Sequence, residues 1–314
     1  MKAIAIKQFG AANELTEMDL PALTVKSDEI KVETHAFSIN PMDIAGRAGY
    51  LSSPFNDQWS FPIVLGYDFA GVVAEVGSDV TDYKVGDRVF GQAPTTRPGN
   101  NGAYSEEVVV TSDLIAPMPE GLSFDQAAAL PIAGLTAYCA IVTNLNVQPG
   151  QKVLVQGGAG GVGLFAVQIA KARGAYVATT ASPSHSELLQ SLGVDEVIDY
   201  HKTSPADILK DYDAVFDTVG DIDTGLKVLK ADGKLVTVAA QPTPEQQNHL
   251  QQQVMFQFTN GTPADLTTLA NYVLDGKIKL TMATKPFSAA DVIEAHKEIE
   301  GHHVTGKIVI HVED

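Results

Sequence analysis

The chain has 314 residues, of which 45% are hydrophobic and 19% charged, a composition that is ordinary for globular proteins. Its length predicts about two domains, with enough apolar side chains for two cores. Its formal net charge of −17 argues against nucleic acid and anionic membrane surfaces as partners, because both attract basic patches.

A single cysteine, Cys139, limits the chemistry that is open to the chain. It excludes a disulfide within the chain and a four-cysteine zinc site, and its apolar neighbours predict a small buried side chain. The apolar run in residues 1–7 is too short for a signal peptide, and no apolar stretch has the length of a transmembrane helix. We therefore expect a cytoplasmic protein whose partner is a small molecule.

Residues 1–122 predict a β-rich domain. Apolar and polar residues alternate along short runs, and glycine and aspartate turns separate these runs. Strands are expected at residues 3–6, 30–38, 71–77, 87–90 and 103–110. Many short strands with such turns are typical of a small barrel or sandwich.

Residues 123–276 predict an α/β domain. Ser123 and Gln126 form a capping box for one helix, and Pro131 begins a second helix that passes through Thr136. Buried strands are then expected at residues 153–155, 175–180, 196–198, 214–216, 235–239 and 254–258, with helices at 186–192, 221–230 and 264–274. Alternation of strands and helices predicts a parallel, doubly wound sheet.

The last residues, 277–314, predict a return to the first domain. Ser288 and Asp291 begin a helix that ends at Gly301. A closing strand follows at residues 307–312.

A glycine-rich turn joins the strand at 153–155 to a helical pattern. It reads Gly158-Ala159-Gly160-Gly161-Val162-Gly163 and matches the dinucleotide fingerprint in its required context. The first glycine allows a tight turn, the second allows close approach of a pyrophosphate, and the third allows close packing of helix and strand. The N-terminus of the helix adds N–H donors and a positive dipole end. The alternative is an ordinary strand-to-helix turn.

Five segments in order carry a family resemblance. They are Ser38–Asp43 with Arg47, Pro62–Gly71, Ala133–Tyr138, Ala159–Gly163 and Thr305–Val309. Over essentially its whole length the chain resembles the medium-chain dehydrogenase/reductase superfamily, and most of all its zinc-free quinone oxidoreductase branch, which includes zeta-crystallin-like proteins. The resemblance implies a GroES-like β-barrel domain, a Rossmann domain with a cofactor cleft between the two, and a homodimer.

The end of the second strand of the α/β domain predicts which dinucleotide binds. NAD sites usually place a carboxylate there, but this strand ends at Ser182 without one. Ser182, Ser184 and His185 can donate to a 2′-phosphate, and the resemblance brings Tyr200 close, so we expect NADPH. Many relatives carry a lysine or arginine near Ser184, which this chain lacks. Alternatively, Ser182 and Ser184 cap the next helix, and both roles can hold.

The sequence predicts no metal site. Zinc-dependent relatives have histidine where this chain has Tyr67, and their early cysteine ligand has no counterpart here. Catalytic zinc needs three protein ligands and an open position. The histidines are scattered, and the adjacent pair His302 and His303 is expected to be solvent-exposed near a helix end.

The chemistry expected is hydride transfer from NADPH to a quinone or an α,β-unsaturated carbonyl. The candidate catalytic residues are Asn40, Tyr50 and Tyr67, and the resemblance places Thr136 beside the nicotinamide. Each has a structural alternative; Asn40 begins a good turn, and Tyr50 can close a loop. The sequences of the expected pocket loops, residues 50–61 and 92–101, do not indicate which substrate binds.

The second hypothesis is an NADPH-binding protein without turnover, with a crystallin-like or redox-sensing role.

Overall fold

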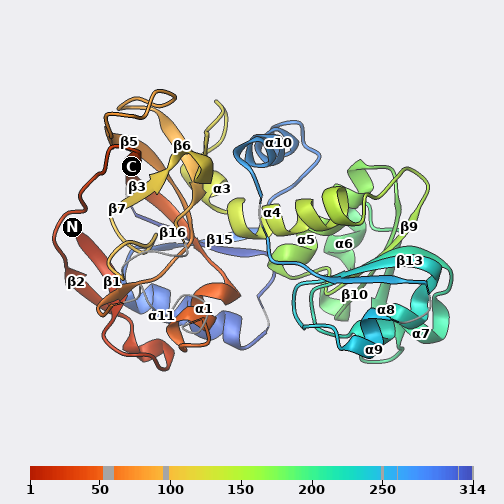
Figure 1. Cartoon of the computed structure of the whole chain (residues 1–314). Helices are drawn as coiled ribbons and strands as arrows, with labels where there is room; N and C mark the ends of the chain where they lie inside the picture. The colour runs from red at the N-terminus through yellow and green to blue at the C-terminus, as the bar shows by residue number, and fades with distance from the viewer. Residues whose placement is uncertain (52–59, 95–98, 249–250, 260, 303, 313–314) are drawn as a thin grey trace. The chain divides into compact units, whose positions relative to one another are not determined.

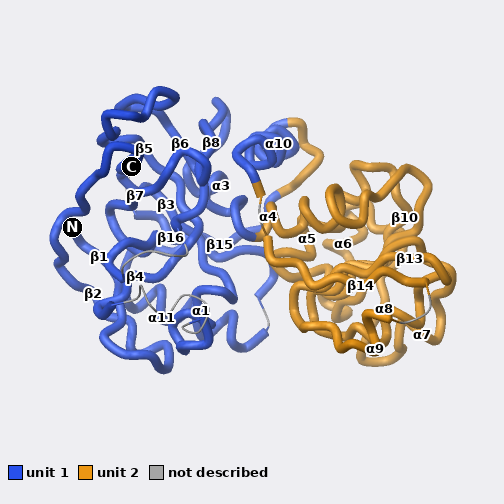
Figure 2. Tube along the Cα trace, in the orientation of Figure 1, with its two compact units in different colours: residues 1–132, 262–274, 280–314 blue, residues 133–261, 275–279 orange. Residues whose placement is uncertain are grey.

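The computed structural model describes residues 1–51, 60–94, 99–248, 251–259, 261–302 and 304–312. The chain forms two compact units, which Figure 2 distinguishes by colour. Unit 1 comprises Met1–Ile132, Thr262–Leu274 and Leu280–Asp314, and unit 2 comprises Ala133–Gly261 and Asp275–Lys279.

The compact units do not have the same bounds as the expected domains. Helices α3 (Phe124–Ala128) and α10 (Pro263–Leu274) belong to unit 1. They do so because α3 packs on strands β3 and β5, and α10 packs on β8. The compact units do not test the domain boundaries expected at residues 122 and 276, which remain predictions.

Unit 1 is built on two mostly antiparallel sheets. One has the order β15-β16-β3-β5-β6-β8, with β7 also paired to β3, and the other has the order β2-β1-β4. The strands of the first are β15 (Met282–Pro286), β16 (Lys307–His311), β3 (Glu29–Ile39), β5 (Asp68–Val76), β6 (Arg88–Gln92), β8 (Ile115–Pro117) and β7 (Glu107–Thr111). The strands of the second are β2 (Thr16–Asp19), β1 (Lys2–Ile6) and β4 (Ile63–Val64).

The sequence located the long strands of unit 1 and missed the short ones. The strand expected at 103–110 covers only Glu107–Thr111, since Ser105 makes a single bridge to Ala3. Strands β2, β4, β8 and β15 were not predicted, because they are short and mostly do not alternate cleanly between buried and exposed positions. Helices α1 (Pro41–Arg47) and α11 (Ala289–Glu300) lie beside each other and belong to the same unit (Figure 1).

The core of unit 1 joins strands from both ends of the chain. Its buried side chains include Ile4, Phe37, Phe69, Val292 and Ile310. Strand β16 pairs antiparallel with β3, with Ile308 opposite Ile39. The strand at residues 307–311 therefore lies in the same sheet as β3.

Unit 2 is a six-stranded parallel sheet in the order β11-β10-β9-β12-β13-β14. The strands are β9 (Lys152–Gln156), β10 (Tyr176–Ala181), β11 (Glu196–Asp199), β12 (Tyr212–Asp217), β13 (Leu229–Thr237) and β14 (Gln253–Phe256). Numbered in chain order this is 3-2-1-4-5-6, the order of the doubly wound dinucleotide-binding fold. The predicted fold class, α/β with a Rossmann sheet, is confirmed.

Helices cover both faces of this sheet, because right-handed crossovers place them on opposite faces when the winding direction reverses after β11. Helices α5 (Gly161–Ala172) and α6 (Ser186–Ser191) lie on one face, and α7 (Pro205–Ile208), α8 (Ile222–Val228) and α9 (Pro244–Gln247) lie on the other (Figure 1). Helix α8 is shorter than expected, since β13 begins at Leu229. Helix α4 (Pro131–Tyr138) continues into a wider, π-helical turn over Cys139–Asn144. Among the described residues, none of the helices is long and apolar enough to cross a membrane.

Candidate functional site

The glycine-rich turn of unit 2 connects β9 to α5. Gly157, one residue before the fingerprint, takes the left-handed conformation with φ of +81°, so the tight turn depends on this residue rather than on Gly158. Its N–H donates to Thr180 Oγ1 at 2.8 Å. Gly158 must be small for another reason, because a Cβ there would lie 2.0 Å from Thr179 Oγ1. The turn is therefore fixed against the neighbouring strand β10.

The remaining two fingerprint glycines face different surroundings. A Cβ on Gly163 would lie 2.1 Å from the carbonyl oxygen of Gly157, so this glycine allows the helix to pack on the turn. A Cβ on Gly160 would meet nothing closer than the same oxygen at 3.6 Å. Gly160 also has an ordinary φ of −73°, so neither conformation nor packing requires glycine there. The space over Gly160, at the N-terminus of α5, fits a ligand that approaches the backbone.

Polar side chains gather where β10 ends. Ser182 Oγ lies 3.0 Å from Ser184 Oγ and 2.8 Å from His185 Nδ1. Ser182 is the N-cap residue of the short 3₁₀ helix Pro183–His185, but its hydroxyl makes no capping hydrogen bond there, and the N-cap residue of α6 is His185.

Tyr200 lies at the same edge of the sheet. The register pairs Ala181 of β10 with Asp199 of β11, so Ser182 and Tyr200 each follow the last paired residue of adjacent strands. The ring of Tyr200 is 55% exposed and lies 4.1 Å, centroid to centroid, from the ring of His201. Its hydroxyl-bearing ring is therefore available at the edge where the fingerprint turn also lies.

Thr136 on α4 is held by residues that follow β14. Its hydroxyl lies 2.8 Å from Thr259 Oγ1, and its carbonyl accepts from Gln257 Nε2 at 2.9 Å. Gln257 in turn accepts from Asn144 Nδ2 at 2.8 Å. Sequence reasoning identified Thr136 but missed Gln257 and Thr259, because a glutamine and a threonine after a strand form no motif.

Asp217 is a third residue that sequence reasoning missed. It ends β12 and is fully buried. One carboxylate oxygen accepts from the backbone N–H groups of Val219, Gly220 and Asp221, and the other accepts from the Thr237 hydroxyl at 2.8 Å. The signal was present, since an aspartate directly after a buried apolar strand has to find several donors.

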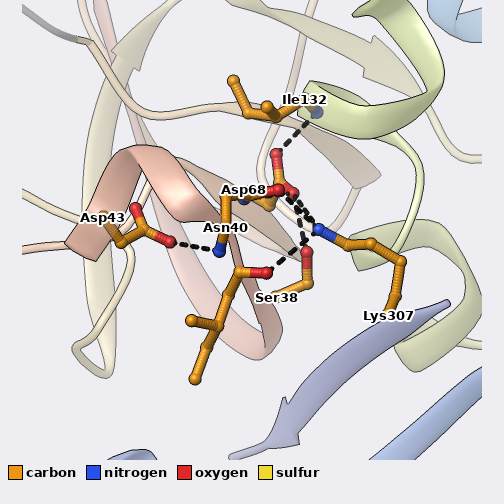
Figure 3. Close-up of polar contacts among 7 residues, drawn as sticks. Ser38, Asn40, Asp43, Asp68, Ile132 and Lys307 are labelled. Carbon is orange, nitrogen blue, oxygen red and sulfur yellow. Dashed lines mark hydrogen bonds and ion pairs between the residues drawn. The ribbon is translucent and has the colours of Figure 1, made fainter. Parts of the chain in front are cut away.

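A buried carboxylate also organises unit 1 (Figure 3). Asp68, at the start of β5, is fully buried. Its Oδ2 accepts from Ser38 Oγ at 2.6 Å and from Asn40 Nδ2 at 2.8 Å, and its Oδ1 accepts from the Ile132 backbone N–H at 2.8 Å. Lys307 Nζ lies 3.4 Å from Oδ2, completing what we call the Asp68 cluster, namely Ser38, Asn40, Asp68, Ile132 and Lys307.

Asp43 lies next to this cluster on α1. Its Oδ2 accepts from the Asn40 backbone N–H at 2.7 Å, as in a helix cap. Burial, and to a smaller extent the nearby Asp68, raise the pKa of the Asp43 carboxyl, while the Asn40 N–H, Lys307 and Tyr104 lower it. The net result is a pKa of about 7. This carboxyl thus titrates near neutral pH.

A chain of polar contacts links Asp43 through Tyr104 and His296 to Arg47. Arg47 Nη1 donates to His296 Nδ1 at 3.1 Å, so the other ring nitrogen, Nε2, carries the proton and donates to the Tyr104 oxygen at 3.0 Å. The Tyr104 proton is then free to point toward Asp43, whose Oδ1 has no partner at hydrogen-bond distance. Burial, together with Arg47, lowers the pKa of His296 to about 3, so this histidine is neutral.

The predicted catalytic residues differ in their surroundings. Asn40 is 2% exposed and belongs to the Asp68 cluster. Tyr67 is 5% exposed, and burial and the nearby Asp43 raise the pKa of its hydroxyl, which keeps the proton. Tyr50 is 81% exposed, just after α1, and its backbone N–H donates to Ala45. The expected pocket loops include residues 52–59 and 95–98, which lie outside the described residues.

A catalytic zinc does not fit the residues around Tyr67. Among the described residues there is no group of three or more histidine, cysteine, aspartate or glutamate side chains that could hold a metal ion. Asp68 already accepts from Ser38, Asn40 and Ile132. His302 is exposed at the end of α11, and His303 lies outside the described residues.

Two protein families match the chain. Residues 26–120 match the alcohol dehydrogenase GroES-like domain, and residues 192–310 match a family described as zinc-binding dehydrogenase. The matched regions correspond to the β-rich part of unit 1 and to a stretch that spans much of the parallel sheet and the closing strand. The chain is therefore built from the two domains of a dehydrogenase.

Relatives and solved structures extend the match over the whole chain. The NADPH-dependent alkenal/one oxidoreductase of Arabidopsis thaliana chloroplasts is 35% identical, with 99% of this chain and 79% of that protein covered. The quinone oxidoreductase of Coxiella burnetii has a TM-score of 0.91 and 34% identity, covering 100% of this chain and 99% of that one. The Escherichia coli quinone oxidoreductase complexed with NADPH has a TM-score of 0.88 and 28% identity, covering 99% and 100%.

These matches define a two-domain oxidoreductase of the dehydrogenase type. More narrowly, the chain belongs to the medium-chain dehydrogenase/reductase superfamily, in the group of quinone oxidoreductases and enone reductases.

Proposed function

We propose that this protein is an NADPH-dependent reductase that transfers a hydride to a quinone or an α,β-unsaturated carbonyl compound. The observation that supports binding of the dinucleotide is the space over Gly160 at the N-terminus of α5. Neither the backbone conformation nor the packing of the protein requires glycine at this position. The acceptor class follows from the relatives, which are named as an alkenal/one oxidoreductase and as quinone oxidoreductases.

In this proposal the cofactor phosphates lie on the fingerprint turn. The pyrophosphate finds space and backbone N–H groups along the six residues of this turn, Gly158, Ala159, Gly160, Gly161, Val162 and Gly163. The 2′-phosphate accepts hydrogen bonds from the side chains of Ser182, Ser184, His185 and Tyr200. Thr136 lies beside the nicotinamide. Bound NADPH supplies the hydride, while the chain supplies position and hydrogen bonds.

The residues that we assign to binding the hydride acceptor belong to unit 1. Hydride transfer to an enone or quinone leaves negative charge on an oxygen, which hydrogen-bond donors stabilise. We assign this role to the Asn40 amide and the Tyr67 hydroxyl, since the raised pKa of Tyr67 keeps it a donor. Tyr50, being exposed, is assigned to contact with the ring or chain of the acceptor.

The experiment that tests the function is NADPH oxidation by a panel of quinones and enones. Turnover with at least one acceptor class, dependent on Asn40 and Tyr67, is the expected result. The alternative function is an NADPH-binding protein with a crystallin-like or redox-sensing role. Tight NADPH binding without turnover on any acceptor would favour that alternative.

Ser182→Asp should invert the choice of cofactor. The wild type is expected to bind NADPH at least ~10-fold more tightly than NADH, because Ser182 and its neighbours offer donors to a 2′-phosphate. A carboxylate at this position repels the phosphate and can accept from the ribose hydroxyls of NADH. Fluorescence titration of both cofactors measures the change, and equal wild-type affinities would contradict the assignment.

We also propose that the reaction needs no metal. Incubation with a strong chelator is expected to leave both kcat and the thermal unfolding midpoint unchanged, because the residues around Tyr67 do not form a zinc site. Elemental analysis of the purified protein is the second measurement. One zinc per chain, lost together with turnover, would instead point to alcohol or aldehyde chemistry.

A homodimer in the cytoplasm completes the proposal. Strand β14 lies at the edge of the parallel sheet, and Met255 on it and Phe258 after it are 47% and 56% exposed. Exposed apolar side chains beside an open strand edge favour pairing with a second copy. Sedimentation analysis measures the oligomeric state.

A further inference from the structure

Lys307 is a buried lysine at the start of β16. Its side chain is 5% exposed, and its ammonium group makes three contacts, which equals its number of N–H groups. Nζ lies 2.6 Å from Asn40 Oδ1, 3.2 Å from the Ile39 carbonyl oxygen and 3.4 Å from Asp68 Oδ2. The shortest contact joins Lys307 to the side chain that we assign to the acceptor oxygen (Figure 3).

These contacts fix which way the Asn40 amide faces. A lysine ammonium can only donate, so the amide atom 2.6 Å from it must be the oxygen. A carboxylate can only accept, so the amide atom 2.8 Å from Asp68 must be the nitrogen. Both neighbours require the same orientation, and a flip of the amide would put two donors together and two acceptors together.

The orientation leaves one donor without a partner. Asn40 Nδ2 has two N–H groups, and Asp68 is the one acceptor that it meets among the described residues. The side chain is only 2% exposed, so its second N–H has little access to bulk water. Buried donors are nearly always satisfied, and a ligand oxygen would satisfy this one.

We propose that Lys307 is a positioning residue that holds the Asn40 amide so that it can donate to the acceptor oxygen and cannot accept from it. This inference rests on the proposed reductase function. It predicts that the site selects ligands with an oxygen acceptor, such as a quinone or enone carbonyl, over ligands that present a hydroxyl or amine donor. The ammonium group also places a positive charge behind the amide that faces the developing oxyanion.

The test is a cycle of Lys307→Met, Asn40→Ala and the double variant, with NADPH and an α,β-unsaturated ketone as substrates. Each single change is expected to lower kcat by about 10-fold or more, with little change in the KM for the ketone, because the lost interaction strengthens in the transition state. The double variant should be no slower than the slower single variant, because Lys307 acts through Asn40. Losses that multiply would overturn the proposal.

A second variant removes the effect of an unpaired buried charge. In Lys307→Met with Asp68→Asn, neither charge of the pair remains, so the fold is expected to be kept. Thermal unfolding and NADPH affinity should then match those of Asp68→Asn alone, which has the same change at the Asp68 hydrogen bonds, while kcat stays lower than in that variant. Recovery of the wild-type kcat would overturn the proposal, because Lys307 would then only balance Asp68. If the wild type turned over no acceptor, both the proposed function and the role of Lys307 would be wrong. If the wild type turned over an acceptor but the reductions in kcat of the single variants multiplied in the double variant, only the role of Lys307 would be wrong.

Discussion

Replacing Gly160 with alanine is expected to weaken NADPH binding by about 10-fold or more without unfolding the protein. The added Cβ meets no protein atom closer than 3.6 Å, and the residue keeps a φ that alanine readily adopts. The methyl group instead occupies the space that the pyrophosphate needs next to the backbone. Fluorescence titration with NADPH gives the affinity, and thermal unfolding should show a midpoint within about 4 °C of the wild type.

Gly163→Ala is the matched control for this prediction. Its Cβ would lie 2.1 Å from a backbone oxygen, which cannot move without shifting the turn. We expect this change to destabilise the protein by about 3 kcal/mol or more, together with loss of NADPH binding. If Gly160→Ala lowered the unfolding midpoint as much as Gly163→Ala, the space over Gly160 would be structural, and its assignment to the cofactor would be wrong.

Asp43→Asn is expected to make the protein more stable than the wild type at pH 8 and no more stable at pH 4. In the folded protein the pKa of Asp43 is raised by burial to about 7, against a usual value of 3.8. Between these two values the folded state holds a proton that the unfolded state has lost, so the free energy of unfolding falls as the pH rises. The loss is complete above about pH 7 and amounts to roughly 4 kcal/mol.

An amide at position 43 is neutral at every pH and similar in shape, so it avoids this loss. Thermal unfolding of both proteins from about pH 4 to pH 8 measures the difference. Asp28→Asn, at an exposed aspartate, is the control and should leave the wild-type pH dependence unchanged. A difference between wild type and Asp43→Asn that is the same at both ends of the range would contradict the prediction.

The fold could be predicted from sequence wherever periodicity was strong. Strands β9, β10 and β12 of the parallel sheet are short runs of mostly buried residues, and the fingerprint turn indicated where β9 ends. The capping box at Ser123 and the closing strand β16 were also predicted correctly. Strand β15 was missed because its five residues are half-exposed and include Lys285 and Pro286.

The candidate site was harder to predict, because its contacts join residues that are distant in sequence. Asn40 and Tyr67 were found through a family pattern, but nothing local shows that Asp68 binds Ser38, Asn40 and Ile132. Lys307 carried a weak signal as a lysine followed by three apolar residues of a closing strand. Its partner Asn40 is 267 positions away, and only the pairing of β16 with β3 brings the two together.

That pairing bears on how the chain folds during synthesis. Unit 2 consists mainly of the continuous stretch Ala133–Gly261, whereas unit 1 needs the last residues to complete its largest sheet. Contacts between distant segments form slowly, and domains emerge from the ribosome in order from the N-terminus. Residues 1–132 are therefore synthesised before unit 2 but wait for β16, which leaves the Ala36–Ile39 part of β3 without its partner strand and Asp68 without Lys307 until β16 has been made. Unit 2, although it is encoded later, can be the first part to reach its native structure.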